Sequence, residues 1–265
     1  MGASVGAALN GARPIVEIGF VDFVGTCLDQ IFNQAAKYRY LSGGAAGVPV
    51  VVRMACGSNG LGYGVHHAQS LEAWFTHIPG LKVVMPSTPG DAKGLLLAAI
   101  EDPDPVIFLE HRNLYWLKAE VPPEYYVCPL GKGAVARPGT DITVVAWSQA
   151  VHWALDAARW AEDKGISCEV IDLRSLVPLD EQCILESVKK TGRLIVCHEA
   201  CQTGGFGGEI VARVASKAFD WLTAAPVRVA APDISVPASV PLEKVYLRPS
   251  TQLPDAILRL HNRHI

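Results

Sequence analysis

Charged residues are scarce in this chain, and no long apolar run accompanies the scarcity. Asp, Glu, Lys and Arg make up 18% of the 265 residues and hydrophobic residues make up 50%, whereas charged residues reach roughly 25% in an average soluble domain. No segment approaches the roughly 18 consecutive apolar residues of a membrane-spanning helix. We therefore expect no membrane segment, and we expect the surplus apolar surface to be buried against other chains in an oligomer.

A basic surface is also missing. The formal net charge is −3 and the pI is about 6.2, so the electrostatic footprint of a nucleic-acid-binding protein is absent. The seven cysteines are scattered and odd in number, which predicts reduced thiols rather than disulfides. Cys197, His198 and Cys201 resemble a metal motif, but no second ligand pair stands at zinc-site spacing, so we expect no metal there.

The most glycine-dense stretch, residues 55–75, lacks the common phosphate-binding motifs. Four glycines fall within residues 57–64, but Val65 stands where a dinucleotide fingerprint needs glycine, and no Gly-Lys-Ser/Thr follows. Such glycine density suits a loop that needs positive φ or brings its backbone close to a ligand.

His66 and His67 follow this loop, between a predicted strand at residues 48–53 and a predicted helix at residues 69–77. Ligands in α/β proteins bind at the carboxyl ends of parallel strands, and an imidazole can transfer a proton near neutral pH. The pattern therefore predicts that one histidine lies in a site. The alternative is a long surface loop with two solvated histidines.

Strand and helix patterns alternate along the chain, which predicts parallel α/β sheets covered by helices on both faces. The first half favours helices at residues 2–10, 29–41 and 91–100 and strands at residues 14–20, 82–85 and 106–110. The second half favours strands at residues 143–146, 167–172, 193–197 and 227–230 and helices at residues 150–164, 180–190, 207–219 and 254–261. Proline-rich residues 119–140 are typical of a linker, so we expect two doubly wound α/β domains, residues 1–118 and 141–265.

Several stretches resemble the beta subunit of the thiamine-diphosphate-dependent 2-oxoacid dehydrogenase component. They include VGAALNGARPIVEI, DQIFNQAAKYRY, HHAQSLEAWFTHIPGLKVVMPSTPGDAKGLL, EDPDPVIFLEHRNLY, CEVIDLRSLVPLD and VKKTGRLIVCHEACQTGGFGGEI. The resemblance implies a transketolase-like pyrimidine-binding domain followed by a transketolase C-terminal-type domain. It also implies a heterotetramer of two alpha and two beta chains.

The same resemblance implies an activity. With an alpha subunit, the chain would catalyse oxidative decarboxylation of a 2-oxoacid and acyl transfer to lipoamide on a dihydrolipoyl acyltransferase core. The stretches AKYRYLSG and GLLLAAIEDPDPVIF favour a branched-chain substrate. The compartment would be the bacterial cytoplasm or the mitochondrial matrix. Two alternatives stay open: a catalytically incompetent structural paralogue, and a subunit of acetoin dehydrogenase or another transketolase-type enzyme.

One cofactor-binding motif is absent. Thiamine diphosphate and its Mg²⁺ are held through a Gly-Asp-Gly start and a following Asn, because Mg²⁺ prefers carboxylate and amide oxygens together with phosphates. No Gly-Asp-Gly occurs here. We therefore expect the alpha subunit to hold the diphosphate and Mg²⁺, and this chain to supply the pyrimidine half and a catalytic histidine.

The resemblance assigns roles to individual residues. His67 matches the active-site histidine that precedes Gln-Ser in the family pattern, and His66 is the less favoured of the pair. Phe23 matches the aromatic residue that packs on the aminopyrimidine ring; it is also compatible with a core phenylalanine. A structural K⁺ site is matched, residue by residue, by Val50, Val51, Ala99, Asp102 and Asp104, although Asp-Pro-Asp is equally compatible with a plain turn.

The resemblance departs at the N-terminus. In the family, a stretch of several dozen residues precedes the segment that matches residues 1–10 and ends in a glutamate that bonds the pyrimidine N1′. No residue here matches that glutamate, and Glu17 lies within a predicted strand at a different position. Two alternatives follow: the chain is truncated, or it has lost the part of the chemistry that the glutamate performs at the pyrimidine N1′.

Overall fold

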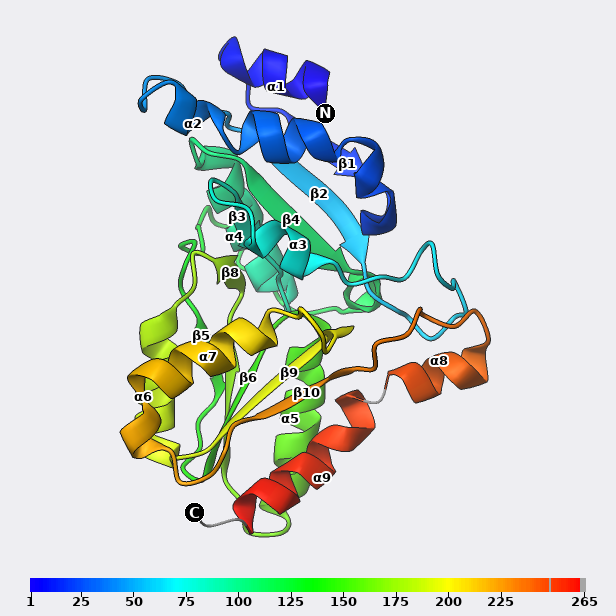
Figure 1. Ribbon diagram of the computed structural model, residues 1–265, viewed down its shortest axis with the longest axis vertical. Coiled ribbons are helices and arrows are strands. Elements are labelled where there is room, and N and C mark those ends of the chain that lie inside the picture. The colour runs from blue at the N-terminus through cyan, green and yellow to red at the C-terminus, as the bar shows by residue number, and fades with distance from the viewer. Residues whose placement is uncertain (248, 263–265) are drawn as a thin grey trace.

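The structure is a computed structural model that describes residues 1–247 and 249–262. Two α/β units are stacked along the long axis, with the N-terminus at one end and the C-terminus at the other (Figure 1). The sheets have the strand orders β1-β2-β4-β3-β8 and β10-β9-β6-β7-β5. The predicted fold class, two α/β units with mainly parallel sheets, is confirmed.

The first sheet is built from short strands of β-branched residues. Its strands are β1 (Ile15–Ile18), β2 (Val51–Cys56), β3 (Lys82–Val84), β4 (Val106–His111) and β8 (Ser175–Val177). Parallel pairing aligns Val51 with Val106 and Cys56 with His111, so that β2 and β4 end side by side. Its helical segments are α1 (Gly2–Leu9), η1 (Val21–Thr26), η2 (Gln30–Ala35), α2 (Tyr38–Leu41), α3 (Glu72–Thr76), α4 (Pro89–Glu101) and η3 (Arg112–Trp116).

The second sheet follows the same plan. Its strands are β5 (Ala134–Arg137), β6 (Ile142–Ala146), β7 (Cys168–Asp172), β9 (Leu194–Cys201) and β10 (Val227–Ala231). Its helices are α5 (Gln149–Glu162), α6 (Glu181–Thr191), α7 (Gly207–Lys217), η4 (Phe219–Trp221), α8 (Val240–Tyr246) and α9 (Pro249–His261). Alanines at 150, 154, 157, 158 and 161 line the buried face of α5.

Each sheet ends in an antiparallel strand that the sequence patterns did not predict. β8 pairs antiparallel with β3, and β5 pairs antiparallel with β7. β5 lies inside residues 119–140, the stretch that was expected to be a linker. β8 comes from the second half of the chain but joins the first sheet. Strands of three or four residues carry too few alternating positions to be recognised by period alone.

Two predicted helices differ in the structure. The helix expected over residues 29–41 is divided into the π-helix η2 and the single turn α2. The helix expected over residues 69–77 begins only at Glu72. The amide and side chain of Gln69 donate to Asp22, and Ser70 donates to Glu199, so tertiary hydrogen bonds hold the preceding residues in the loop.

One hydrophobic core continues from the first sheet into the second. It includes Val52 and Leu109 of the first sheet and Val145 and Val196 of the second. A separate cluster packs α4 against the opposite face of the first sheet, and another packs α5 and α9 against the opposite face of the second. Because a shared core joins the units, they are expected to unfold as one cooperative body.

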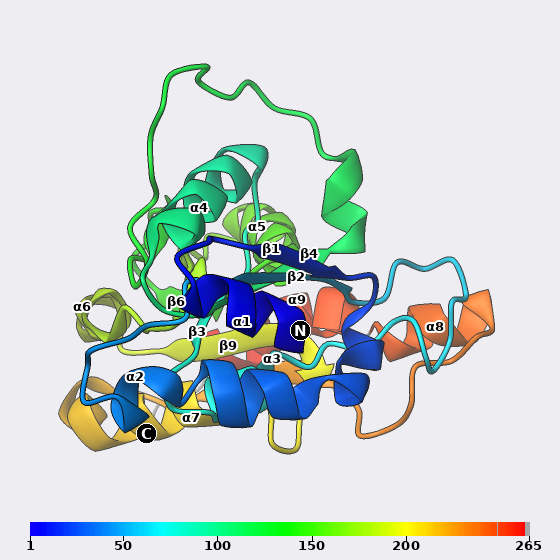
Figure 2. The same ribbon diagram turned by 90° about the horizontal axis from the view of Figure 1, so that it is seen from above.

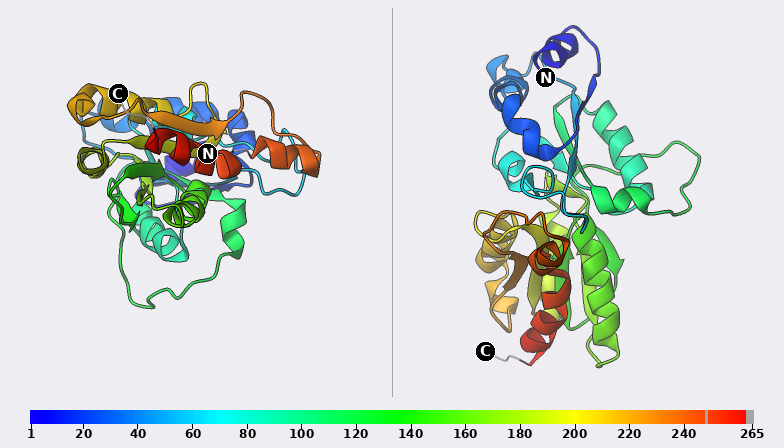
Figure 3. Two further views of the ribbon diagram at one scale, coloured as in Figure 1. Left: turned by 90° about the horizontal axis from the view of Figure 1, so that it is seen from below. Right: turned by 90° about the vertical axis from the view of Figure 1, so that its right-hand side faces the viewer.

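Residues 117–133 form an extended excursion between η3 and β5 (Figures 2 and 3). It returns against α4, where Cys128 donates its amide to the Gly94 carbonyl at 3.0 Å. A Cβ on Gly94 would lie 3.0 Å from that amide nitrogen, so the close approach requires glycine. No helix in the described residues is long and apolar enough to cross a membrane. All seven cysteines are free thiols.

Buried carboxyl groups lie where the two units meet. Glu72 of α3 is only 1% exposed, and its Oε1 accepts a hydrogen bond from the Trp147 indole at 3.1 Å. Its Oε2 has no hydrogen-bond partner among the described residues. Burial raises the pKa of Glu72 to about 7. Burial likewise raises the pKa of Asp172, which accepts a hydrogen bond from Ser87 across the junction, to about 7.

We predict that Glu72→Gln changes the pH dependence of the free energy of unfolding. Because the pKa of Glu72 is raised from 4.5 to about 7 in the folded chain, the folded state holds more protons than the unfolded state between these values. Stability from this group is therefore lost as the pH rises through that window. Glutamine keeps an acceptor for Trp147 but does not titrate. Relative to the variant, the wild type should lose up to about 3 kcal/mol between pH 5 and pH 8.

The measurement is urea unfolding of both proteins across that pH range. Asp172 is present in both proteins, so its contribution cancels in the difference. Parallel stability profiles would contradict the prediction.

Candidate functional site

The glycine-rich loop leaves β2 at a position that only glycine can occupy. Gly57 has a φ of +80°, and a Cβ there would overlap the ring of His111 at the end of β4. The Gly57 carbonyl accepts a hydrogen bond from the guanidinium of Arg112 at 3.0 Å. The loop therefore starts locked against the neighbouring strand end.

His67 packs against two phenylalanine rings, Phe23 on η1 and Phe20 just before η1. Its ring centroid is 5.0 Å from that of Phe20 and 5.4 Å from that of Phe23, edge-to-face in both pairs. His67 is half-buried, whereas His66 is exposed. Phe23 is 44% exposed, so it is not the fully buried core residue that was its alternative interpretation.

A buried cation completes this group of rings. Arg112, 8% exposed, places its guanidinium 5.2 Å from the Phe20 centroid and 4.3 Å from the Tyr63 centroid. Phe20, Tyr63 and Arg112 follow β1, β2 and β4, whose ends lie side by side. Neither Arg112 nor Tyr63 was predicted as a site residue. Nothing in the local pattern around them distinguishes them from ordinary loop residues.

Hydrogen bonds from both halves of the chain hold the loop around His67. On the first-half side, Gln69 donates its amide and its side chain to Asp22 Oδ1, at 3.3 and 2.9 Å. On the second-half side, Glu199 of β9 accepts from the Ser58 amide at 2.6 Å. Its other oxygen lies 2.7 Å from His111 Nε2. Because the Asn113 amide donates to His111 Nδ1, the ring proton is assigned to Nε2.

The residues of the possible metal motif do not converge. Cys197 and His198 are adjacent on β9, so their side chains point to opposite faces of the sheet. The His198 ring stacks on Trp147, with centroids 5.2 Å apart, and burial lowers its pKa to about 4. Within the described residues, no group of three or more His, Cys, Asp or Glu side chains could hold a metal ion.

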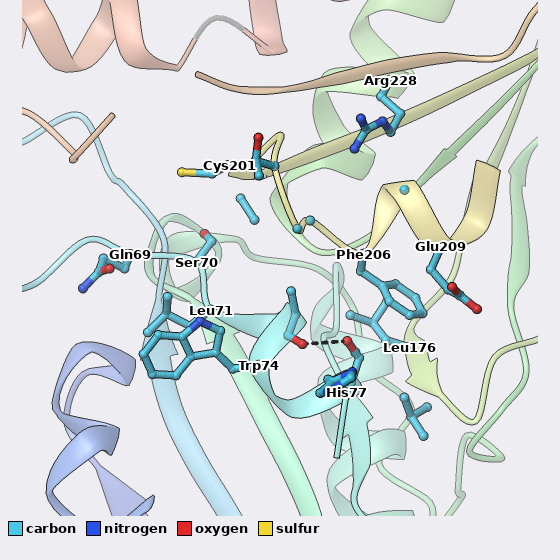
Figure 4. Close-up of a pocket in the computed structure, with 18 of the residues that line it drawn as sticks. Gln69, Ser70, Leu71, Trp74, His77, Leu176, Cys201, Phe206, Glu209 and Arg228 are labelled. Atoms are coloured by element: carbon cyan, nitrogen blue, oxygen red, sulfur yellow. Dashed lines mark hydrogen bonds between the residues drawn. The ribbon is translucent and has the colours of Figure 1, made fainter. Parts of the chain in front are cut away.

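A pocket of about 1330 Å³ opens beside this site, between α3 and α7 (Figure 4). The loop and α3 contribute Gln69, Ser70 and Trp74 to its wall, and the second unit contributes Phe206 and Arg228. Neither His67 nor Phe23 lines it. The pocket and the aromatic cluster are therefore separate features that share the end of the glycine-rich loop.

Comparisons with known proteins agree with this architecture. Residues 1–117 match the transketolase pyrimidine-binding domain, and residues 131–252 match the transketolase C-terminal domain. The chain is 49% identical to the beta subunit of acetoin:2,6-dichlorophenolindophenol oxidoreductase of Cupriavidus necator, over 96% of this chain and 75% of that protein. It is 45% identical to the 2-oxoisovalerate dehydrogenase beta subunit of Bacillus subtilis, over 93% of this chain and 76% of that protein. The chain belongs to this family of transketolase-type dehydrogenase beta subunits.

Two further comparisons agree with these findings. A pyruvate dehydrogenase E1 component beta subunit from Acholeplasma laidlawii is 49% identical over 89% of this chain and 72% of that protein. A solved structure named as a split-gene transketolase, an inactive beta4 tetramer, superposes with a TM-score of 0.79 over 99% of this chain and 81% of that chain. At 24% identity, that structure supports the fold alone.

The aromatic cluster fits the pyrimidine half of the family's cofactor. The half-exposed Phe23 ring offers a flat surface to a heteroaromatic ring. The cluster lies at the carboxyl ends of parallel strands, where ligands bind in such sheets. The diphosphate half is not matched in this beta subunit, because no Gly-Asp-Gly occurs in the sequence.

The residues of the expected K⁺ site lie close to side-chain cations. Lys82 Nζ is 2.6 Å from both carboxylate oxygens of Asp102, and Arg13 donates to the Asp102 carbonyl at 2.9 Å. Arg39 pairs with the Asp104 carboxylate. In this arrangement lysine and arginine side chains pair with the charged oxygens of both aspartates. The K⁺ site, which would also involve Val50, Val51 and Ala99, stays a prediction.

We predict that Gly57→Ala destabilises the beta subunit far more than Gly60→Ala. Both glycines have positive φ, near +80° and +76°, but only a Cβ at position 57 overlaps another residue. The shared backbone strain costs about 1–2 kcal/mol, and the overlap with His111 should add about 2 kcal/mol. Chemical unfolding of the two variants beside the wild type measures the difference. Equal losses would show that the His111 contact does not constrain the loop.

Proposed function

We propose that this chain, with an alpha subunit, forms a thiamine-diphosphate-dependent 2-oxoacid dehydrogenase component and supplies its pyrimidine-side residues. The observation that carries the proposal is the packing of His67 against both Phe20 and Phe23, at the strand ends of a chain without a diphosphate motif. A complete cofactor site then requires a second chain. An alpha subunit that carries Gly-Asp-Gly and binds Mg²⁺ fits that need.

Each residue of the cluster has a proposed task. Phe23 would pack on the aminopyrimidine ring of the cofactor and orient it. Arg112 would keep the Phe20 and Tyr63 rings in place, because its guanidinium lies over both. When bound, thiamine diphosphate supplies carbanion stabilisation. His67 would hold or transfer a proton during substrate turnover and lipoamide acylation, as imidazoles do near neutral pH.

The proposed assembly is a heterotetramer of two alpha and two beta chains that delivers its acyl product to a dihydrolipoyl acyltransferase core. The compartment follows from the source of the chain, bacterial cytoplasm or mitochondrial matrix. The preferred substrate class is a 2-oxoacid, with branched-chain acids favoured.

Acetoin is a second candidate substrate. It rests on the 49% identity to the beta subunits of acetoin:2,6-dichlorophenolindophenol oxidoreductase from two bacteria, Cupriavidus necator and Bacillus subtilis. The test is to reconstitute this chain with an alpha subunit and compare turnover of pyruvate, 3-methyl-2-oxobutanoate and acetoin. No turnover of any of the three would overturn the proposed function.

We predict that His67→Ala in the reconstituted heterotetramer retains cofactor binding but loses most of the activity. A general acid–base group typically contributes about 10²–10⁴-fold, roughly 3–5 kcal/mol of barrier. The measurement is the rate of lipoyl-domain acylation. His66→Ala is the matched control, because His66 is exposed and adjacent. A near-wild-type rate for His67→Ala, or a larger loss for His66→Ala, would show that the role does not belong to His67.

We also predict that the purified chain is at least a dimer at micromolar concentration, with residues 2–10 and 29–40 near the interface. Tyr40 is 88% exposed and Leu41 is 74% exposed, and such large apolar side chains favour burial in a partner surface. Light scattering measures the mass. Tyr40→Glu should weaken association, whereas Lys118→Glu, at an exposed polar position outside these segments, should not. A monodisperse wild-type monomer would refute the prediction.

A further inference from the structure

The glycine-rich loop lies against a segment near the C-terminus, residues 236–246, which includes α8 (Figures 1 and 2). A Cβ on Gly62 would lie 2.5 Å from the Ala238 carbonyl oxygen, and a Cβ on Gly64 would lie 3.0 Å from the Ala238 Cβ. These two glycines therefore allow another part of the same chain to approach the loop. All four glycines of residues 57–64 have positive φ, which is one of the two expectations for this stretch. At Gly62 and Gly64 the close backbone approach is to the chain itself.

Glu243 on α8 is the main polar contact between the segment and the loop. Its side chain is completely buried. It accepts hydrogen bonds from the Ser58 hydroxyl, from the Gly60 amide at 3.1 Å and from the Gly62 amide at 2.7 Å. In the described part of the chain, no lysine, arginine or histidine forms an ion pair with it. A buried carboxylate without a cation depends on these donors, because leaving it unpaired is costly.

The residue on the other side of His67 is also held by the second half of the chain. Ala68 is 1% exposed and packs in a small cluster with Ala231, Val236 and Tyr246. The histidine ring itself makes edge-to-face contacts with Phe20 and Phe23. Its position therefore depends on how the loop is anchored before and after it.

We propose that residues 236–246 act as a clamp that fixes the loop carrying His67, and that Glu243 is its positioning residue. This proposal rests on the proposed function only for its catalytic consequence. Glu243 acts through the loop backbone and does not touch the aromatic cluster. Releasing its three hydrogen bonds should let residues 58–62 open locally while the sheets stay intact, because local openings involve only the contacts that are broken.

The first measurement is amide hydrogen exchange on the isolated chain. Glu243→Gln keeps the shape of the side chain but turns one acceptor into a donor that faces the loop amides. Exchange of residues 58–65 should accelerate about tenfold or more, which corresponds to the loss of one charge-assisted hydrogen bond. Exchange in β6 should not change. Lys244→Ala, a neighbouring exposed position on α8, is the control and should match the wild type.

The second measurement uses the reconstituted heterotetramer. With Glu243→Gln, kcat for lipoyl-domain acylation should fall about 10-fold or more, because a displaced histidine contributes less. The affinity for thiamine diphosphate should change less than twofold. Ser58→Ala removes one donor and keeps the carboxylate, so its effects should be smaller and in the same direction. If Glu243→Gln does not fold, Ser58→Ala carries both measurements.

The outcomes separate the two proposals. Unchanged exchange of residues 58–65 in Glu243→Gln overturns the clamp. Faster exchange with wild-type kcat, in an enzyme that His67→Ala inactivates, overturns the positioning role. Faster exchange in the isolated Glu243→Gln chain, together with a wild-type heterotetramer that turns over none of the three substrates, supports the clamp and overturns the proposed function.

Discussion

The carboxylate of Glu199 joins the two halves of the chain at the point where the site is built. It comes from β9 of the second sheet, and both of its main donors, the Ser58 amide and His111 Nε2, belong to the first half. These bonds fix the end of β4 and the start of the glycine-rich loop together. Because both groups are buried, losing either partner would leave an unsatisfied polar atom in the core. The register of the loop, and so the place of His67, depends on this contact.

Buried carboxyl groups gather at the junction around Glu199. Glu72 and Asp172 are both nearly fully buried, and burial raises the pKa of each to about 7. Their hydrogen bonds to Trp147 and Ser87 run between the two units. The junction therefore combines apolar packing with polar hydrogen bonds that specify how the units meet. Because the pKa of each carboxyl is raised, the stability of the folded chain depends on pH.

The backbone couples the units as well. β8 comes from the second half of the sequence but completes the first sheet, and the core runs without interruption from Val52 to Val196. A loop held by both units can keep a histidine in place only if the units do not move apart. The shared strand, the shared core and the Glu243 contact all hold the two units together. The position of His67 thus depends on rigidity within this chain.

The sequence by itself determined what depends on local pattern. Alternating periodicity gave the central parallel strands and the main helices, and the resemblance gave the family. It also drew attention to His67 and Phe23, whose rings the structure brings together, while their roles stay predictions. Tertiary structure decided the rest. The antiparallel strand β8 is too short to show a period, and Arg112, Glu199 and Glu243 look like surface charges until the fold buries them. Periodicity is read from neighbours in sequence, whereas the burial of a charge depends on hydrogen-bond partners that lie more than 50 residues away along the chain.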